Sequence, residues 1–134
     1  LLHNIVYCSR AAAGLTRQDI QDIVATARRH NAIHGISGLL VFGSGVFFQW
    51  IEGPTTSIEA LMARIHRDAR HSAVVELSVN AEVRERVFPS WDMELVQPDD
   101  IREVLQDAMR DARAAVHTRT LRELLQRVDQ AGLC

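Results

Sequence analysis

Three hydrogen-bonding side chains lie in stretches of the sequence that are otherwise apolar. Tyr7, the only tyrosine, belongs to the first apolar segment, Gln49 lies in a later one, and Asn31 extends the apolar stripe of a predicted helix. An amide or phenol that is buried without a hydrogen-bond partner costs about 1–3 kcal/mol. Each of these groups must therefore meet either another part of the protein or a bound ligand.

Gln49 has the most constrained surroundings. It lies within the string GVFFQWIEGP, whose β-branched and aromatic residues predict a strand over 46–51. Side chains alternate along a strand, so Gln49 shares one face with Phe47, while Phe48 and Trp50 occupy the other face. Both faces are apolar, which predicts an interior strand.

The remaining elements follow from apolar periodicity and from capping and turn residues. A Gly-rich hairpin over 43–45 makes the second and third strands antiparallel neighbours. Thr16 with Asp19 predicts the cap of the first helix, and Thr56 with Glu59 has the spacing of a capping box for the second. Further strands are predicted over 3–9, 36–42, 73–79 and 91–96, and helices from Thr16 to about His30, from Thr56 to about Arg70 or His71, over 98–108, and from about Leu121 to Gly132.

The order β-α-β-β-α-β-β predicts an α+β fold. We expect a ferredoxin-like five-stranded mixed sheet with two helices on one face, followed by a two-helix C-terminal extension. The domain boundary is expected between residues 1–97 and 98–134. Either the C-terminal helices or a second subunit should cover the other apolar face of the sheet. In this topology the first and third strands are central neighbours, so Tyr7 and Gln49 can converge with Asn31.

Composition excludes several classes of function. The chain has 134 residues, a formal charge of −2 and a pI near 6.3, which disfavours nucleic acid as the main partner. The sequence has no membrane-length apolar run and no recognisable signal peptide, so we expect a cytoplasmic protein. His30 and His34 lack further ligands, which disfavours a metal site. The two cysteines, Cys8 and Cys134, are expected to be free thiols.

Several strings resemble successive motifs of one family. IVYCSRA, ARRHNAIHGISGLLVF, GVFFQWIEGP, RIHRDARHSAV and FPSWDMEL are similar to the motifs of the BLUF domain, a flavin-binding blue-light sensor of bacteria and some protists. The resemblance runs from about Asn4 to Leu95 and includes the spacing of Tyr7, Asn31 and Gln49. One departure is Ala32, where many relatives have a second asparagine.

The resemblance implies a noncovalently bound flavin, usually FAD and possibly FMN, between the first two helices. By this resemblance Asn31 binds the pyrimidine edge of the ring, and Gln49 bridges Tyr7 and the N5/O4 region. The ring would contact Ile23, Val24 and Ile65, and the ribityl chain and phosphates would lie near Arg64, Asp68, Arg70 and His71. The alternative for this last group is a solvated helix end with an Arg64–Asp68 ion pair.

The resemblance also implies a mechanism. Light drives an electron and then a proton from Tyr7 toward the flavin, and Gln49 rotates or tautomerises before the charges recombine. Trp91 and Met93 match positions thought to relay the change outward, and alternation puts both on one face of the fifth strand. Core packing alone is the alternative role for Trp91 and Met93.

The expected function is thus that of a short stand-alone photoreceptor. It is not an enzyme and signals through an unknown partner protein, with a homodimer expected because the leucine stripes of the tail need a surface to cover them. Folding of the last helix onto the sheet is the alternative to that dimer. Two rival functions are a small flavin-dependent reductase and a cofactor-free ferredoxin-like interaction module.

Overall fold

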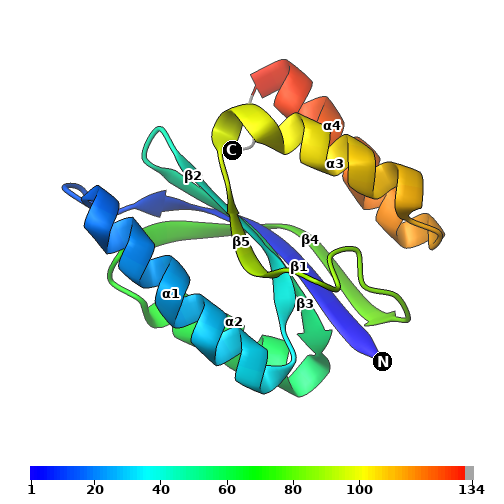
Figure 1. Cartoon of the computed structure of the whole chain (residues 1–134), viewed down its shortest axis with the longest axis horizontal. Coiled ribbons are helices and arrows are strands. Elements are labelled where there is room, and N and C mark those ends of the chain that lie inside the picture. The colour runs from blue at the N-terminus through cyan, green and yellow to red at the C-terminus, as the bar shows by residue number, and fades with distance from the viewer. Residues whose placement is uncertain (132–134) are drawn as a thin grey trace.

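The protein is a five-stranded mixed sheet with two helices against each face (Figure 1). The computed structural model describes residues 1–131, and the strands are ordered β4-β1-β3-β2-β5. This arrangement confirms the predicted ferredoxin-like α+β fold. The elements are β1 (Leu2–Ala11), α1 (Arg17–His34), β2 (Ser37–Gly43), β3 (Val46–Pro54), α2 (Thr55–Arg67), β4 (His71–Val83), β5 (Asp92–Val96), the 3-10 turn η1 (Pro98–Asp100), α3 (Ile101–Asp111) and α4 (Ala115–Ala131).

β3 is the central strand, as predicted. It pairs antiparallel with β1 in a register that sets Tyr7 opposite Gln49, and antiparallel with β2 on its other side. The β2–β3 connection turns through Ser44 and Gly45, whose φ angles of 52° and 74° both lie in the left-handed region. Two consecutive left-handed residues match the twist of a tight hairpin and fix its register.

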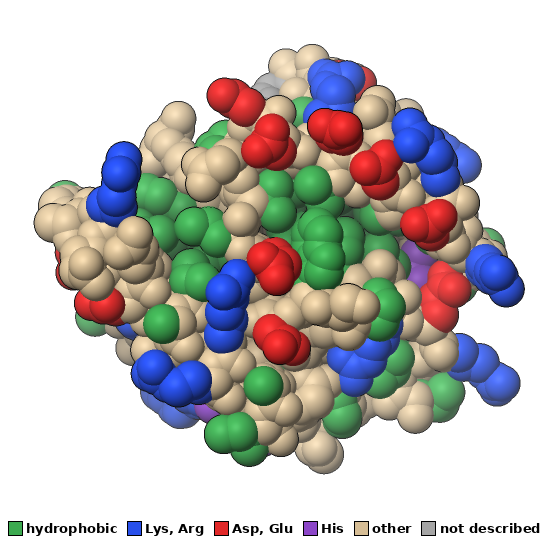
Figure 2. Space-filling model, in the orientation of Figure 1, with side chains coloured by type: hydrophobic (Ala, Val, Ile, Leu, Met, Phe, Trp, Pro, Cys, Tyr) green, Lys and Arg blue, Asp and Glu red, His purple; other side chains and the backbone are tan. Residues whose placement is uncertain are grey.

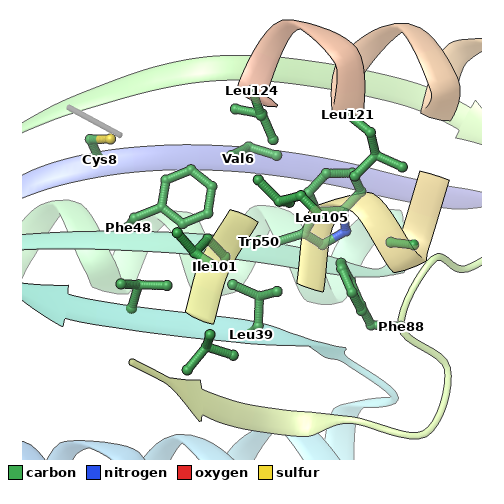
Figure 3. Packing of buried hydrophobic residues seen from close by; sticks show 13 residues of the cluster. Val6, Cys8, Leu39, Phe48, Trp50, Phe88, Ile101, Leu105, Leu121 and Leu124 are labelled. Carbon is green, nitrogen blue, oxygen red and sulfur yellow. The ribbon is translucent and has the colours of Figure 1, made fainter. Parts of the chain in front are cut away.

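Each face of the sheet has its own apolar core. The pocket-side cluster, beneath α1 and α2, contains Tyr7 and Phe47. The tail-side cluster, beneath α3 and α4, contains Phe48 and Trp50 (Figure 3). The two C-terminal helices therefore cover the second face with their own stripes, and no second subunit is needed for this. The tail-side stripe residues are Ile101, Leu105, Ala108, Leu121 and Leu124.

The caps of the first two helices differ from each other. α1 begins with the predicted capping box of Thr16 and Asp19 and ends at Gly35, which is left-handed. The capping box predicted for α2 is wrong, because the helix begins directly after Pro54 without a side-chain cap. Its predicted end is also wrong, because α2 stops at Arg67 before a turn and His71 already belongs to β4.

The prediction that Trp91 and Met93 share a face is wrong. Met93 belongs to the pocket-side cluster, whereas Trp91 packs against the tail-side cluster and stacks on Phe88 with ring centroids 5.1 Å apart. Simple alternation fails because Met93 has a φ of 78° and the β2–β5 register shifts beside Gly38. Gly38 is required at this irregularity, since a Cβ there would lie 1.8 Å from the carbonyl oxygen of Trp50.

The remaining sequence predictions concern the two cysteines, the end of the last helix and the absence of a membrane span. The free-thiol prediction is wrong for Cys8, which is disulfide-bonded. Cys134 and the predicted helix end at Gly132 lie outside the described residues. Within residues 1–131, none of the helices combines the length and the apolar character that a membrane span requires.

Candidate functional site

A cavity of about 310 Å³ lies between α1, α2 and the pocket-side face of the sheet. Its volume falls at the lower end of the range typical of small-molecule sites. The apolar lining comes from one face of each helix and from the central strands, so the cavity is a slot with apolar walls between helices and sheet. The apolar lining residues are Ile23, Ala27, Leu40, Phe47, Leu61 and Ile65.

A chain of hydrogen bonds crosses the sheet side of this cavity. The Tyr7 hydroxyl donates to Gln49 Oε1, and Gln49 Nε2 donates to the Met93 sulfur at 3.0 Å. The β1–β3 register brings Tyr7 and Gln49 together, and the left-handed backbone of Met93 accompanies its place on the pocket side. Burial, and then the negative charge of Asp68, raise the pKa of the Tyr7 phenol, so that it stays neutral and keeps its proton.

Asn31 supplies an unpaired donor on the helix side of the cavity. The side chain is 1% exposed and lines the cavity. Its Nδ2 has no hydrogen-bond partner among the described residues, while Oδ1 lies 3.4 Å from His30 Nδ1. Because an unpaired buried amide is costly, this Nδ2 is suited to an acceptor on a ligand.

The mouth of the cavity is basic and contains three arginines, Arg64, Arg67 and Arg70. The predicted Arg64–Asp68 pair is not the one formed, because Asp68 is bound by Arg70 through its backbone N–H and its guanidinium. Arg64 lines the cavity. The mouth therefore presents positive charge to an anionic part of a ligand.

His71 lines the cavity from the first position of β4, just beyond the end of α2. Its ring bridges Ser9 Oγ at 2.7 Å and the carbonyl oxygen of Ile65 at 2.6 Å. Since the carbonyl only accepts, Nε2 donates to Ile65 and Nδ1 faces the Ser9 hydroxyl. The ring also meets Tyr7 edge-on at a centroid distance of 6.4 Å. His71 thus joins the end of α2 to β1 beside the cavity.

Acid should weaken the ion pair between Asp68 and Arg70 at the mouth of the cavity and so lower the stability of the fold. Hydrogen bonds from Arg70 lower the pKa of the Asp68 carboxyl to about 2. A carboxyl with a lowered pKa stabilises the fold above its unfolded pKa of about 4 and loses this contribution as the pH falls toward 2. We expect Asp68→Asn to lower the free energy of unfolding at pH 7 by about 1 kcal/mol, since Arg70 is half-exposed and screened. Urea unfolding across the acid range measures this, and curves that coincide with the wild type would contradict it.

The cavity does not include all of the residues proposed from the sequence. Val24 is buried in the pocket-side cluster without lining the cavity, Ala32 is exposed, and Trp91 packs on the tail side. The sequence interpretation missed several lining residues. Most of these lie one or two helical turns from the residues it proposed, so the 3.6-residue period could have found them. The missed residues are Thr26, Ala27, His30, Leu40, Phe47, Leu61 and Arg67.

The donor set favours an organic ligand over a metal. Within residues 1–131 no group of three or more His, Cys, Asp or Glu side chains gathers to hold a metal ion. The cavity instead combines apolar walls, a phenol and an amide on the sheet side, a second amide on the helix side, and arginines at the mouth. This set fits a flat heteroaromatic ligand with hydrogen-bonding edges and an anionic tail.

Comparisons with known proteins agree with this arrangement. The family model described as "Sensors of blue-light using FAD" matches residues 2–94. The beta subunit of photoactivated adenylate cyclase from Euglena gracilis is 38% identical over 93 residues, which cover 69% of this chain and 11% of that protein. The blue light- and temperature-regulated antirepressor BluF of Escherichia coli (strain K12) is 27% identical over 111 residues, which cover 80% of this chain and 28% of that protein. The chain thus spans about a tenth of the cyclase subunit and about a quarter of the antirepressor.

Solved structures with a similar fold include members of the same family. The dark-state structure of BlrB, a BLUF protein, has a TM-score of 0.72 and 27% identity, covering 92% of this chain and 97% of that one. Klebsiella pneumoniae BlrP1, solved with FMN and cyclic diGMP, has a TM-score of 0.78 and 26% identity, and the match covers 97% of this chain and 35% of that one. Because the family model spans more than half of the sequence, the chain belongs to the BLUF family of blue-light sensors that use FAD.

Proposed function

We propose that this chain is a blue-light photoreceptor that binds FAD noncovalently in the cavity between α1, α2 and the sheet. The observation that carries the proposal is the hydrogen-bonded chain from Tyr7 through Gln49 to Met93 beside an apolar slot. A bound flavin would supply blue-light absorption and, once excited, a strong oxidant within reach of a phenol.

Residues of the cavity would hold the flavin at both ends. The orphaned Nδ2 of Asn31 would donate to the pyrimidine edge, with Ile23 and Ile65 against the ring. Arg64 and Arg70 at the mouth would face the ribityl chain and phosphates, with Asp68 fixing Arg70. FMN is the alternative cofactor, because it shares the ring and one phosphate, and the BlrP1 structure was solved with it.

The role of Tyr7 follows from its neutral state. With a raised pKa the phenol does not release a proton by itself. Its proton would therefore move only after the Tyr7 ring has given an electron to the oxidant that a bound, excited flavin would supply. Its hydroxyl donates to Gln49 Oε1, which makes Gln49 the immediate acceptor for that proton. Charge recombination would return the electron and the proton to Tyr7 and leave only the Gln49 amide rearranged.

A rotated Gln49 amide breaks a specific contact. The thioether of Met93 accepts hydrogen bonds but has no proton to donate. Only the orientation with Nε2 toward Met93 makes this bond, and a rotated amide points Oε1 at the sulfur instead. Rotation therefore releases Met93 and the start of β5, while Nε2 becomes available to the Tyr7 oxygen.

The signal would pass from β5 to a partner protein, and the sensory unit itself would turn over no substrate. In this proposal residues 1–97 form the sensor and residues 98–134 the tail that modulates its output. A homodimer stays a prediction, but the leucine stripe no longer supports it, because that stripe packs on the sheet of the same chain.

The visible absorption spectrum tests this function. We expect the purified protein to show an oxidised flavin spectrum that moves to the red under blue light, without bleaching, and returns in the dark. Chromatography of the released flavin identifies FAD or FMN. A colourless protein that takes up neither added flavin would refute the proposal, and bleaching by NADH in the dark would indicate a reductase.

A further inference from the structure

One apolar hollow of the surface takes no part in the proposed flavin site. It lies between α3 and β5, with acidic side chains along α3 at its border (Figure 2). Trp91, just before β5, and Val104 of α3 are both half-buried, and both pack against the tail-side cluster from these two elements. This α3–β5 groove is therefore a surface on which an apolar side chain could be buried.

The helical period places aspartates beside Val104. Ile101, Leu105 and Ala108 of α3 face the sheet, and Arg102 forms an ion pair with Asp129 of α4, so the Arg102 side of α3 faces α4. Positions 100, 104, 107 and 111 recur at the spacing of a single helical face and lie on the opposite side. This acidic face of α3 comprises Asp107 and Asp111 of the helix and Asp100, the last residue of η1, around Val104, and all three aspartates are exposed.

The charge of this region differs from that of the whole chain. Residues 92–111 contain seven acidic and two basic side chains, a formal charge of −5, whereas the whole chain carries −2. Both basic residues are already engaged, Arg102 with Asp129 and Arg110 with Asp107. None of the described ion pairs involves Asp100 or Asp111.

We propose that the α3–β5 groove docks a basic amphipathic helix of a partner protein. An apolar side chain of that helix would lie between Trp91 and Val104, and its lysines or arginines would face the aspartates of α3. A second copy of this chain in a symmetric dimer would bring the two acidic faces together, which is unfavourable. Nucleic acid and anionic lipid would be repelled for the same reason.

The groove is linked to the light-responsive amide of Gln49 through a short stretch of backbone and one hydrogen bond. Trp91 and Met93 flank Asp92 on opposite faces of the sheet, and Met93 accepts the hydrogen bond from Gln49. A shift of Met93 therefore moves the backbone that carries Trp91. Docking in the dark does not depend on the proposed photochemistry, but its light dependence rests on the proposed function.

Fluorescence anisotropy of a labelled leucine–lysine amphipathic peptide tests the docking. We expect the flavin-loaded protein to bind it, with an affinity that falls as salt rises. Replacing the three aspartates together, as D100N/D107N/D111N, should weaken binding about tenfold. The control D22N/E59N/E123N makes the same change of charge at exposed positions elsewhere and should bind within about twofold of the wild type. A peptide of the same composition, scrambled so that its leucines share no face, should bind at least about tenfold more weakly.

The outcomes of these experiments separate this inference from the proposed function. Equal binding by the two triple variants would overturn the docking site, as would equal binding of the scrambled peptide. Binding that is lost in D100N/D107N/D111N and differs at least about twofold between dark and blue light supports the whole inference. If the flavin shifts normally but no peptide binds, only the docking fails, and if no flavin binds but the peptide does, only the photoreceptor function fails.

Discussion

Gln49→Leu is expected to abolish the reversible red shift while the protein still binds flavin. Leucine fills nearly the same volume but cannot accept from Tyr7 or donate to Met93, so no hydrogen bond remains to be rearranged. The apolar walls, Asn31 and the arginines of the mouth are unchanged, so we expect flavin affinity to stay within about tenfold of the wild type. Difference absorption spectra recorded before and after a blue flash measure the shift.

The matched control for this prediction is Gln21→Leu. Gln21 is exposed on α1 and does not line the cavity, so the same substitution there should leave both the shift and its dark recovery intact. A full-sized shift in Gln49→Leu would show that the amide is not the light-responsive group. A variant that fails to bind flavin would instead assign Gln49 a role in holding the cofactor.

The sequence predicts the centre of the fold well because strong local signals agree there. The segment around Gln49 is apolar on both faces, the Gly-rich turn fixes the β2–β3 hairpin, and α1 has a complete capping box. These signals define the sheet order and bring Tyr7 opposite Gln49. The sequence therefore allows Tyr7, Gln49 and Asn31 to converge, and the structure places all three in the lining of one cavity.

The irregular parts of the site could not be predicted from local patterns. The positions of Trp91 and Met93 on opposite faces depend on a positive φ and a register shift, and neither has a signature in the alternation of side chains. The end of α2 depends on the turn at Asp68, whose carboxylate binds the backbone N–H of Arg70. Both features arise from tertiary context and not from periodicity.

A buried carboxylate was also missed, because a glutamate near a strand end is usually exposed. Glu52 is 1% exposed and accepts four hydrogen bonds. Two come from the backbone N–H groups of Val87 and Phe88, at 3.0 and 2.7 Å, and the others come from Trp50 Nε1 and Ser37 Oγ. The Glu52 side chain therefore fixes the connection between β4 and β5, which leads directly to Trp91 and Met93.

We expect Glu52→Ala to lower the free energy of unfolding by about 3–5 kcal/mol. The substitution leaves the indole N–H and two backbone N–H groups buried without an acceptor, and it opens space beside Phe88, whose ring packs against Trp50 at 5.4 Å. Denaturant unfolding at a fixed excess of flavin measures the change, because ligand binding itself adds to stability. Glu59→Ala, at an exposed position of α2, is the matched control and should change stability by less than about 0.5 kcal/mol. A similarly small effect of Glu52→Ala would mean that water enters and binds the freed donors, so that the β4–β5 connection does not depend on this carboxylate.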